Sequence, residues 1–312
     1  MIRVAIVGAR RRNAGLGEFL TRFFRELGAE VAGVVGRSEA SARETADHLS
    51  AKYGITTRGF GSLLDLFARA GPVDAVAICS PHEAHLEHLR QCAQAGVHTL
   101  CEKPLVWGAG LDLERETRQV AEAFRAQGKL LMLNAQWPQI LATFRRLHPG
   151  VDPGRMTRFE MGMCPPGEGL SMIPEAVPHA ISLLLALLGP GEAGEIRAAY
   201  PDPSSREALT LTFRYAGLRG AADCRLVYRQ SLAVPRPTYI AVDGARIDRV
   251  VKMPGYEVGF TNGKQTLWIE DPLKAHVRDF LEAIRSGKSR TDEEGLLCHS
   301  RILAQFRSAV PV

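Results

Sequence analysis

The sequence predicts an α/β protein of two domains, the first built on a doubly wound parallel sheet and the second on a large, mostly antiparallel sheet. Up to about residue 135, short apolar runs alternate with segments of helical periodicity, which is typical of parallel strands joined by crossover helices. From about residue 155, strand-like runs follow one another with few helices between them. The 312 residues also exceed the size at which single cores usually stop growing, so two domains are expected.

The first domain, expected over residues 1–135, contains apolar runs that are bounded tightly by turns. Runs of this kind indicate strands that are buried on both faces, as in parallel sheets. The expected strands are residues 4–7, 31–35, 75–79, 98–101 and 130–133. The expected helices are residues 18–27, 40–53, 63–70, 82–95 and 111–127.

The second domain, expected over residues 136–312, is an α/β domain with a different pattern. Apolar and polar residues alternate over residues 209–215, which indicates a strand with one buried face, as in antiparallel sheets. A helix over residues 176–188 ends at Gly189-Pro190, and helices over residues 273–285 and 293–308 close the chain, free to pack back on the first domain. The expected strands are residues 155–163, 195–200, 208–215, 221–228, 238–242 and 247–253.

Composition and charge exclude several classes of function. Lys and Arg number 39 against 34 acidic residues, but much of the excess is local and no long basic stripe with interleaved aromatics appears, so a small anionic ligand is favoured over nucleic acid. The six cysteines lack the close spacing of a zinc site or a disulfide framework, so no metal and a cytoplasmic location are expected. No apolar run reaches the ~18 residues of a membrane span, and no signal-peptide pattern opens the sequence.

A glycine-rich turn joins the first strand to the first helix. Glycines at such a turn let the backbone approach a pyrophosphate, and the helix N-terminus supplies amide donors. The spacing departs from G-x-G-x-x-G, so a glycine turn without a ligand is the alternative interpretation. The residues expected to bind the cofactor here are Gly8, Ala9, Arg10, Arg11, Arg12, Gly15 and Gly17.

The second strand ends at Gly36-Arg37-Ser38, where an acidic residue would bind the ribose 2′-hydroxyl of NAD. A guanidinium pairs bidentately with phosphate, so Arg37 with Ser38 suits the 2′-phosphate of NADP. NADP is therefore the expected cofactor. The alternative is that Arg37 is a solvated surface residue and that NAD binds.

Two motifs follow at later strand ends. The segment Asp74 to His85 contains Ser-Pro-x-x-x-His, and Glu102-Lys103-Pro104 follows it. With the first strand and its glycine turn, these segments resemble the glucose-fructose oxidoreductase / inositol dehydrogenase / MocA family over essentially the whole chain. The resemblance implies a Rossmann domain, a second α/β domain whose large sheet often mediates a homodimer or homotetramer, and NAD(P)-dependent oxidation of a secondary alcohol or reduction of a carbonyl.

The resemblance also implies roles for individual residues. Glu102 and Lys103 would reach the nicotinamide and the substrate hydroxyl. In the second domain the family pattern D-x-G-x-H-x-x-D has Glu175 in place of its first acid and matches at His179, whereas Val177 and Ser182 depart from it. The nicotinamide-ribose side of the cofactor groove would be lined by Ser80, Pro81 and His85. His82 is expected to bind the cofactor as well.

Hydride transfer from an alcohol requires a base for the hydroxyl proton. Lys103 is the first candidate, because Pro104 holds it in a turn at the edge of the sheet. His179 is the second, as a proton partner or as a hydrogen-bond donor that orients the substrate, and Glu175 lies one helical turn before it. Trp137 is expected to line the substrate pocket, in a segment where relatives often carry an arginine.

The leading function is an NADP-dependent oxidoreductase acting on a sugar, polyol or related metabolite. An imine or ketone reductase of a biosynthetic pathway is an alternative, suggested by the missing second acid and by Met161, Met163 and Met172. A non-catalytic, dinucleotide-sensing regulator is a further alternative, because Val177 and Ser182 depart from the family pattern.

Overall fold

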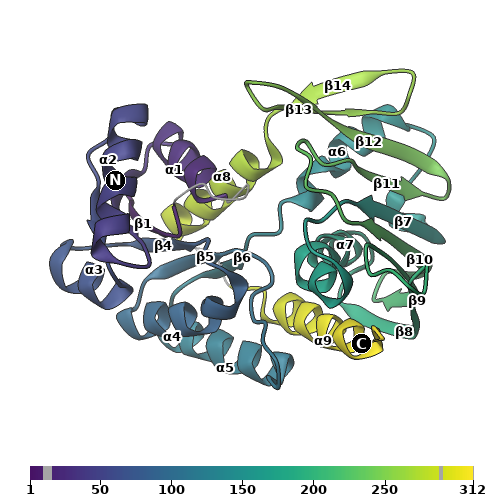
Figure 1. The fold of residues 1–312 in the computed structure, drawn as a ribbon, viewed down its shortest axis with the longest axis horizontal. Helices are drawn as coiled ribbons and strands as arrows, with labels where there is room; N and C mark the ends of the chain where they lie inside the picture. Colours follow the sequence, from purple (N-terminus) through teal and green to yellow (C-terminus); the bar gives the residue numbers. More distant parts are fainter. Residues whose placement is uncertain (10–15, 288–290, 312) are drawn as a thin grey trace. The chain divides into compact units, whose positions relative to one another are not determined.

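The computed structural model describes residues 1–9, 16–287 and 291–311 (Figure 1). The chain divides into two compact units, Met1–Asn134 with Leu273–Glu293, and Ala135–Pro272 with Glu294–Val312. The first contains a six-stranded parallel sheet and the second an eight-stranded sheet that is mostly antiparallel. The predicted fold class is therefore confirmed. The closing helices divide between the units, since the first unit includes Leu273–Glu293 and the second includes Glu294–Val312.

The sheet of the first unit has the strand order β3-β2-β1-β4-β5-β6, and its neighbouring strands pair in parallel. The order reverses between β1 and β4, and ligands of open α/β sheets bind outside the carboxyl ends of strands at such a point. The strands are β1 (Arg3–Val7), β2 (Glu30–Val35), β3 (Arg58–Phe60), β4 (Ala75–Ile78), β5 (His98–Cys101) and β6 (Leu131–Leu133).

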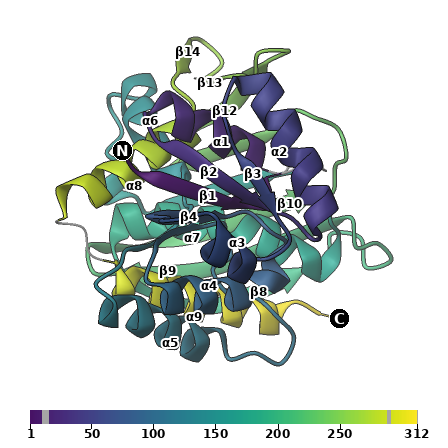
Figure 2. The ribbon, with the colours of Figure 1, turned by 90° about the vertical axis from the view of Figure 1, so that its left-hand side faces the viewer.

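Helices cover both faces of this sheet. Figure 2 shows α4 and α5 side by side below the strands, and α1 and α8 lie on the other face (Figure 1). The helices are α1 (Gly17–Glu26), α2 (Glu39–Tyr53), α3 (Leu63–Arg69), α4 (His85–Ala95), α5 (Leu113–Ala126) and α8 (Pro272–Ser286). A single 3-10 turn, η1 (His82–Ala84), precedes α4, so the helix predicted over residues 82–95 begins with this turn.

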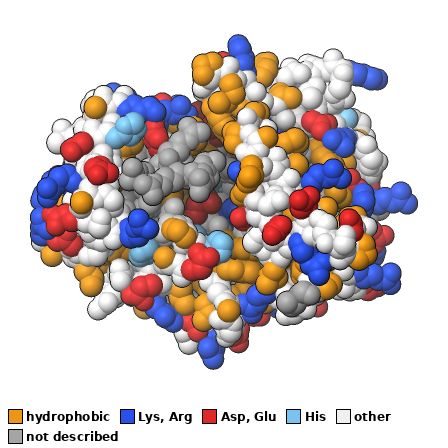
Figure 3. All heavy atoms as spheres, viewed as in Figure 1, with side chains coloured by type: hydrophobic (Ala, Val, Ile, Leu, Met, Phe, Trp, Pro, Cys, Tyr) orange, Lys and Arg blue, Asp and Glu red, His pale blue; other side chains and the backbone are white. Residues whose placement is uncertain are grey.

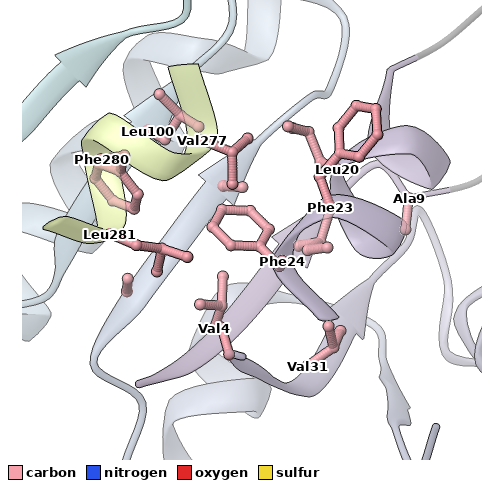
Figure 4. Close-up of a cluster of buried hydrophobic side chains, with 14 of the residues drawn as sticks. Val4, Ala9, Leu20, Phe23, Phe24, Val31, Leu100, Val277, Phe280 and Leu281 are labelled. Carbon is pink, nitrogen blue, oxygen red and sulfur yellow. The ribbon is translucent and has the colours of Figure 1, made fainter. Parts of the chain in front are cut away.

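The core of the first unit lies between β1, α1 and α8. Figure 4 shows Phe24 of α1 facing Phe280 of α8, and their ring centroids are 6.3 Å apart in an edge-to-face arrangement. Both rings are fully buried, together with Val4 and Val277. Buried aromatic side chains of this size dominate core energetics, so they anchor α8 to the first sheet. Helix α8 therefore belongs to the first unit, although the other residues of that unit end at Asn134.

The sheet of the second unit has the order β14-β13-β12-β11-β7-β10-β9-β8, in which β7 and β10 are parallel and the other pairs antiparallel. Its helices are α6 (Leu141–Leu147), α7 (Met172–Leu188) and α9 (Glu293–Ala309). The strands are β7 (Arg158–Met163), β8 (Gly191–Ala199), β9 (Ala208–Gly217), β10 (Gly220–Arg229), β11 (Thr238–Val242), β12 (Ala245–Lys252), β13 (Glu257–Thr261) and β14 (Thr266–Ile269).

Three predicted starts of elements in the second unit are wrong. Strand β8 begins at Gly191, whereas the prediction began it at residue 195. Helix α7 begins at Met172 and carries Pro178 inside it, whereas the prediction began it at residue 176. Strand β7 begins at Arg158, because the 3-10 turn η3 (Pro153–Arg155) occupies the start of the predicted strand. The early start of α7 places Glu175 and His179 one turn apart in the same helix.

The stretch Gly169–Leu188 is long and apolar enough to cross a membrane by length and composition alone, and 67% of its most apolar window is buried inside the protein. The core helix of a globular protein has these properties as well.

Figure 3 shows positive and negative side chains interspersed over the face in view.

Candidate functional site

The turn after β1 depends on two glycines. Gly8 has φ +79°, and a Cβ on it would lie 2.7 Å from the carbonyl oxygen of Cys79 at the end of β4. A Cβ on Gly17 would lie 2.5 Å from the carbonyl oxygen of Gly8. The start of α1 therefore packs directly on the turn after β1, and this turn packs on the end of β4, as a backbone cradle for a pyrophosphate requires. The methyl group of Ala9 is buried in the core, so Ala9 offers a ligand only its backbone (Figure 4).

Four of the predicted cofactor-binding residues lie outside the described residues. They are Arg10, Arg11, Arg12 and Gly15.

The end of β2 carries Arg37, whose side chain is exposed, and Ser38, which caps α2. The Ser38 hydroxyl accepts a hydrogen bond from the backbone N–H of Ser41 at 3.3 Å. The first acid after the strand is Glu39, whose carboxylate lies 3.3 Å from Arg43 and 3.8 Å from Arg69. This acid is therefore paired with two arginines.

His85 connects the turn after β4 to the turn after β5. Its Nε2 lies 2.9 Å from the carbonyl oxygen of Ser80, and its Nδ1 lies 2.7 Å from that of Pro104. The side chain is only 1% exposed, whereas the prediction had it line the nicotinamide-ribose side of the cofactor groove. The Ser80 hydroxyl is also engaged, at 3.0 Å from His88 Nδ1. These contacts hold the turn after β4 and the turn after β5 together.

Burial lowers the pKa of His85 from 6.5 to about 4, so the ring is neutral at pH 7. As the pH falls from about 6.5 to about 4, the unfolded chain binds a proton that the folded chain does not, and stability is lost. We expect the protonation of His85 to lower the free energy of unfolding by about 3 kcal/mol over that range. Unfolding by urea between pH 4 and pH 7 measures it. Burial lowers the pKa of His88, His98 and His276 as well, so their losses add in the same direction.

The His85→Gln variant should be less stable at pH 7 but should lose less stability on acidification than the natural protein. The control is His48→Gln, because the His48 side chain is 59% exposed. An equal dependence on pH in the natural protein and in His85→Gln would contradict this prediction.

His82 and Pro81 lie at the start of η1. Pro81 is exposed, and the His82 ring lies 6.3 Å from the ring of Trp107 in an edge-to-face arrangement. His82 Nε2 also lies 3.0 Å from a carboxylate oxygen of Glu83. Trp107 follows the Glu-Lys-Pro turn, and nothing in the sequence pattern indicated that it pairs with His82.

Glu102 and Lys103 follow β5 directly, and the Lys103–Pro104 peptide bond is cis. The Glu102 carboxylate accepts a hydrogen bond from Asn134 Nδ2 at 2.6 Å and one from the backbone N–H of Lys103. Burial raises the pKa of Glu102, while the charge of Lys103 and these two donors oppose the rise. Lys103 is half-buried, and its positive charge acts on a carboxylate whose position is fixed by these hydrogen bonds.

The second unit places Glu175 and His179 on α7. The Glu175 carboxylate accepts a hydrogen bond from the backbone N–H of Gly167 at 3.1 Å, so it anchors the loop before the helix. His179 is half-buried, and its ring centroid lies 6.0 Å from that of Trp137. Ser182 donates a hydrogen bond to the His179 carbonyl oxygen at 2.8 Å, so the residue that replaces the second acid is turned to its own helix.

Trp137 lies in a 3-10 turn, η2 (Trp137–Ile140), and contacts both His179 and the ring of Phe260, whose centroid is 6.3 Å away. The side chain is 5% exposed. Little of its surface is therefore open to a ligand, and its ring packs beside that of His179. Among the described residues, no group of three or more His, Cys, Asp or Glu side chains is placed to hold a metal ion.

The first unit matches a family model described as "Oxidoreductase family, NAD-binding Rossmann fold", over residues 2–135. The UDP-N-acetylglucosamine 3-dehydrogenase of Acidithiobacillus ferrooxidans is 26% identical over 306 residues, which cover 91% of this chain and 88% of that protein. The first unit therefore carries the NAD-binding Rossmann fold of the glucose-fructose oxidoreductase / inositol dehydrogenase / MocA family. Inositol 2-dehydrogenase of Rhizobium meliloti is 28% identical over 117 residues, so the match spans 37% of this chain and 32% of that family member.

Solved structures show the same fold over both units. The UDP-N-acetylglucosamine 3-dehydrogenase superposes with a TM-score of 0.71 at 21% identity, covering 99% of this chain and 97% of that chain. A 3-ketoreductase from Actinomadura kijaniata in complex with TDP-benzene and NADP gives a TM-score of 0.71 at 20% identity, covering 99% and 98%.

Proposed function

We propose that this protein is an NADP-dependent oxidoreductase that transfers a hydride between the nicotinamide and a secondary alcohol or carbonyl of a sugar, polyol or related small metabolite. The observation that carries the proposal is the position of Lys103. It follows β5 at the carboxyl edge of the sheet, where the glycine turn after β1 packs on the end of β4. This edge is where dinucleotides bind in open α/β sheets.

The residues present fit the cofactor. The Gly8 turn and the N-terminus of α1 would receive the pyrophosphate, and Arg37 with the N-terminus of α2 would receive the 2′-phosphate. When bound, a nicotinamide cofactor supplies the hydride donor or acceptor. Lys103 takes the proton of the substrate hydroxyl during oxidation and returns it during reduction. His179, supported by Trp137, is proposed to orient the substrate oxygen.

A sugar or polyol is the substrate class that the relatives support, since they are named as dehydrogenases of inositol and of a nucleotide sugar. One argument for an imine or ketone reductase does not hold for two of its three methionines. Met161 and Met172 are fully buried, so these two methionines fill the core and do not make an apolar pocket. The argument against a regulator without turnover is the presence of both Lys103 and His179.

Absorbance of NADPH at fixed protein concentration tests the proposed function. The natural protein is assayed against sugars, polyols, nucleotide sugars, ketones and imines in both directions. We expect turnover with at least one sugar or polyol derivative. Binding of NADPH with no turnover of any compound would instead support the regulator.

Replacement of Arg37 by Ala should lower the affinity for NADPH by about 10- to 100-fold, because a hydrogen-bonded charge pair with the 2′-phosphate is lost. The affinity for NADH should change little. Energy transfer from tryptophan to the reduced nicotinamide measures both constants. Arg155→Ala, at a side chain that is 89% exposed, is the control for the loss of one positive charge. Equal affinities of the natural protein for NADPH and NADH would contradict the role of Arg37.

We further propose that the protein forms a homo-oligomer through the face of the eight-stranded sheet that carries Arg225 and Glu160. On β10, Leu226 and Tyr228 are buried, while Arg225 points to the other face and pairs with Glu160 at 3.1 Å. A cavity of about 710 Å³ lies on this face, lined in part by arginine side chains. Light scattering of the full chain measures its mass in solution.

A further inference from the structure

The side chain of Asn134, directly after β6, is buried against Glu102. Asn134 is 2% exposed, and its backbone N–H donates to the carbonyl oxygen of Cys101 at 2.7 Å. Its Nδ2 donates to Glu102 Oε1 at 2.6 Å. Within the part of the chain that the structure describes, Oδ1 of Asn134 is buried and has no hydrogen-bond partner. The amide nitrogen of Asn134 therefore donates a hydrogen bond to Glu102, while its oxygen accepts none from the described residues.

A buried amide oxygen without a donor is unfavourable, so this arrangement requires an explanation. A half rotation of the amide exchanges its oxygen and nitrogen at nearly unchanged shape. An ionised Glu102 accepts a hydrogen bond from the amide N–H, and a protonated Glu102 donates its O–H to the amide oxygen. Asn134 is thus the kind of side chain that can hold Glu102 in both of its protonation states.

The groups that face Glu102 come from three strands. They are Cys79 after β4, Cys101 at the end of β5, Lys103 and Asn134. Burial raises the pKa of both thiols, so both are neutral at pH 7. Burial also raises the pKa of Glu102, against the effect of Lys103 and the two hydrogen-bond donors. Lys103 is therefore the positive charge in this set, and the amide of Asn134 is one of the groups that decide whether Glu102 stays ionised beside it.

We propose that Asn134 is a positioning residue for the proton chemistry of Lys103, acting through Glu102. When Lys103 takes the proton of a substrate hydroxyl, the new ammonium lies beside a carboxylate that Asn134 holds in place. When the amine returns the proton to a substrate oxygen, Glu102 can take up a proton from solvent and remain hydrogen-bonded to the same amide. This role rests on the function proposed above, in which Lys103 is the acid and base.

Infrared spectroscopy tests the contact without any turnover. The carboxyl band of Glu102 is identified by its loss in Glu102→Gln, and it is then followed as a function of pH. Removal of the amide donor in Asn134→Leu should move the titration of Glu102 upward by about one pH unit, because the donor stabilises the carboxylate. Thr99→Val is the matched control, since Thr99 is a fully buried polar residue on β5. Asn134→Ser replaces Asn134→Leu if the larger apolar side chain prevents folding.

The pH dependence of kcat tests whether Asn134 acts on Lys103 through Glu102. In Asn134→Leu the profile should shift to lower pH, because a Glu102 that is protonated more easily no longer favours the protonated amine. KM should stay within about twofold, and the shift should vanish when Glu102→Gln is combined with Asn134→Leu.

The outcomes separate the two proposals. A band that titrates identically in Asn134→Leu and in the natural protein overturns the role of Asn134 whether or not the protein turns over a substrate. A shifted band with an unshifted rate profile overturns it as well. A shifted band in a protein that has no turnover leaves the contact real but removes the proposed function and, with it, this role.

Discussion

Replacement of Lys103 by Met should lower kcat by about 10²- to 10⁴-fold and leave the affinity for NADPH nearly unchanged. This is the usual loss when a general acid or base is removed. Lys103→Arg should be almost as slow, because a guanidinium stays protonated at any working pH and does not exchange the proton. Steady-state kinetics and an NADPH titration measure the two effects separately.

The matched control for this prediction is Lys129→Met. Lys129 precedes β6, so it lies at the opposite edge of the same sheet from the end of β5. An unchanged kcat in Lys103→Met, or an equal loss in Lys129→Met, would remove Lys103 from the mechanism.

Replacement of Gly8 by Ala should abolish most cofactor binding and destabilise the first unit. Its φ of +79° disfavours a side chain, and the new Cβ would lie 2.7 Å from the carbonyl oxygen of Cys79. The conformational part amounts to about 1–2 kcal/mol. Displacing backbone from a packed strand end adds about 1–3 kcal/mol. Because the ends of β1 and β4 must then separate, we expect the affinity for NADPH to fall by more than about tenfold.

Gly54→Ala is the control that separates these two causes. Gly54 has φ +60°, and no other atom lies within 4 Å of the position its Cβ would take. This variant should show the conformational loss alone and bind NADPH normally. Urea unfolding and cofactor titration of both variants measure the difference. Equal losses in the two variants would show that the contact between the strand ends is unimportant.

The strands of the first sheet could be predicted where each is an apolar run buried on both faces, as β1 and β4 are. Strand β3 could not, because Arg58-Gly59-Phe60 is too short to show a pattern. In the second unit, α6 has seven residues, and β14 exposes Trp268 to 51%, so neither has the burial pattern of a longer element. Pairing with a neighbouring strand, not local sequence, fixes β3 and β14.

The candidate site could be predicted only in part. Lys103, Glu102 and His179 stand in recognisable motifs, so their residue types and spacing indicate their chemistry. The contacts of His85 with Pro104, and of Asn134 with Glu102, join residues 19 and 32 positions apart. Such contacts depend on which strand ends are neighbours, and strand order is a property of the whole sheet. The sequence therefore indicated the candidate reacting groups better than the groups that contact them.

The central claim is that the amine of Lys103 lies within proton reach of the reacting oxygen. A crystal structure of the natural protein with NADPH and an alcohol or carbonyl compound found to turn over tests it most directly. The account predicts that Lys103 Nζ lies ~3 Å from the reacting oxygen or is joined to it through one water. An amine directed into bulk solvent, or a nicotinamide bound away from the turn that follows β5, would contradict it.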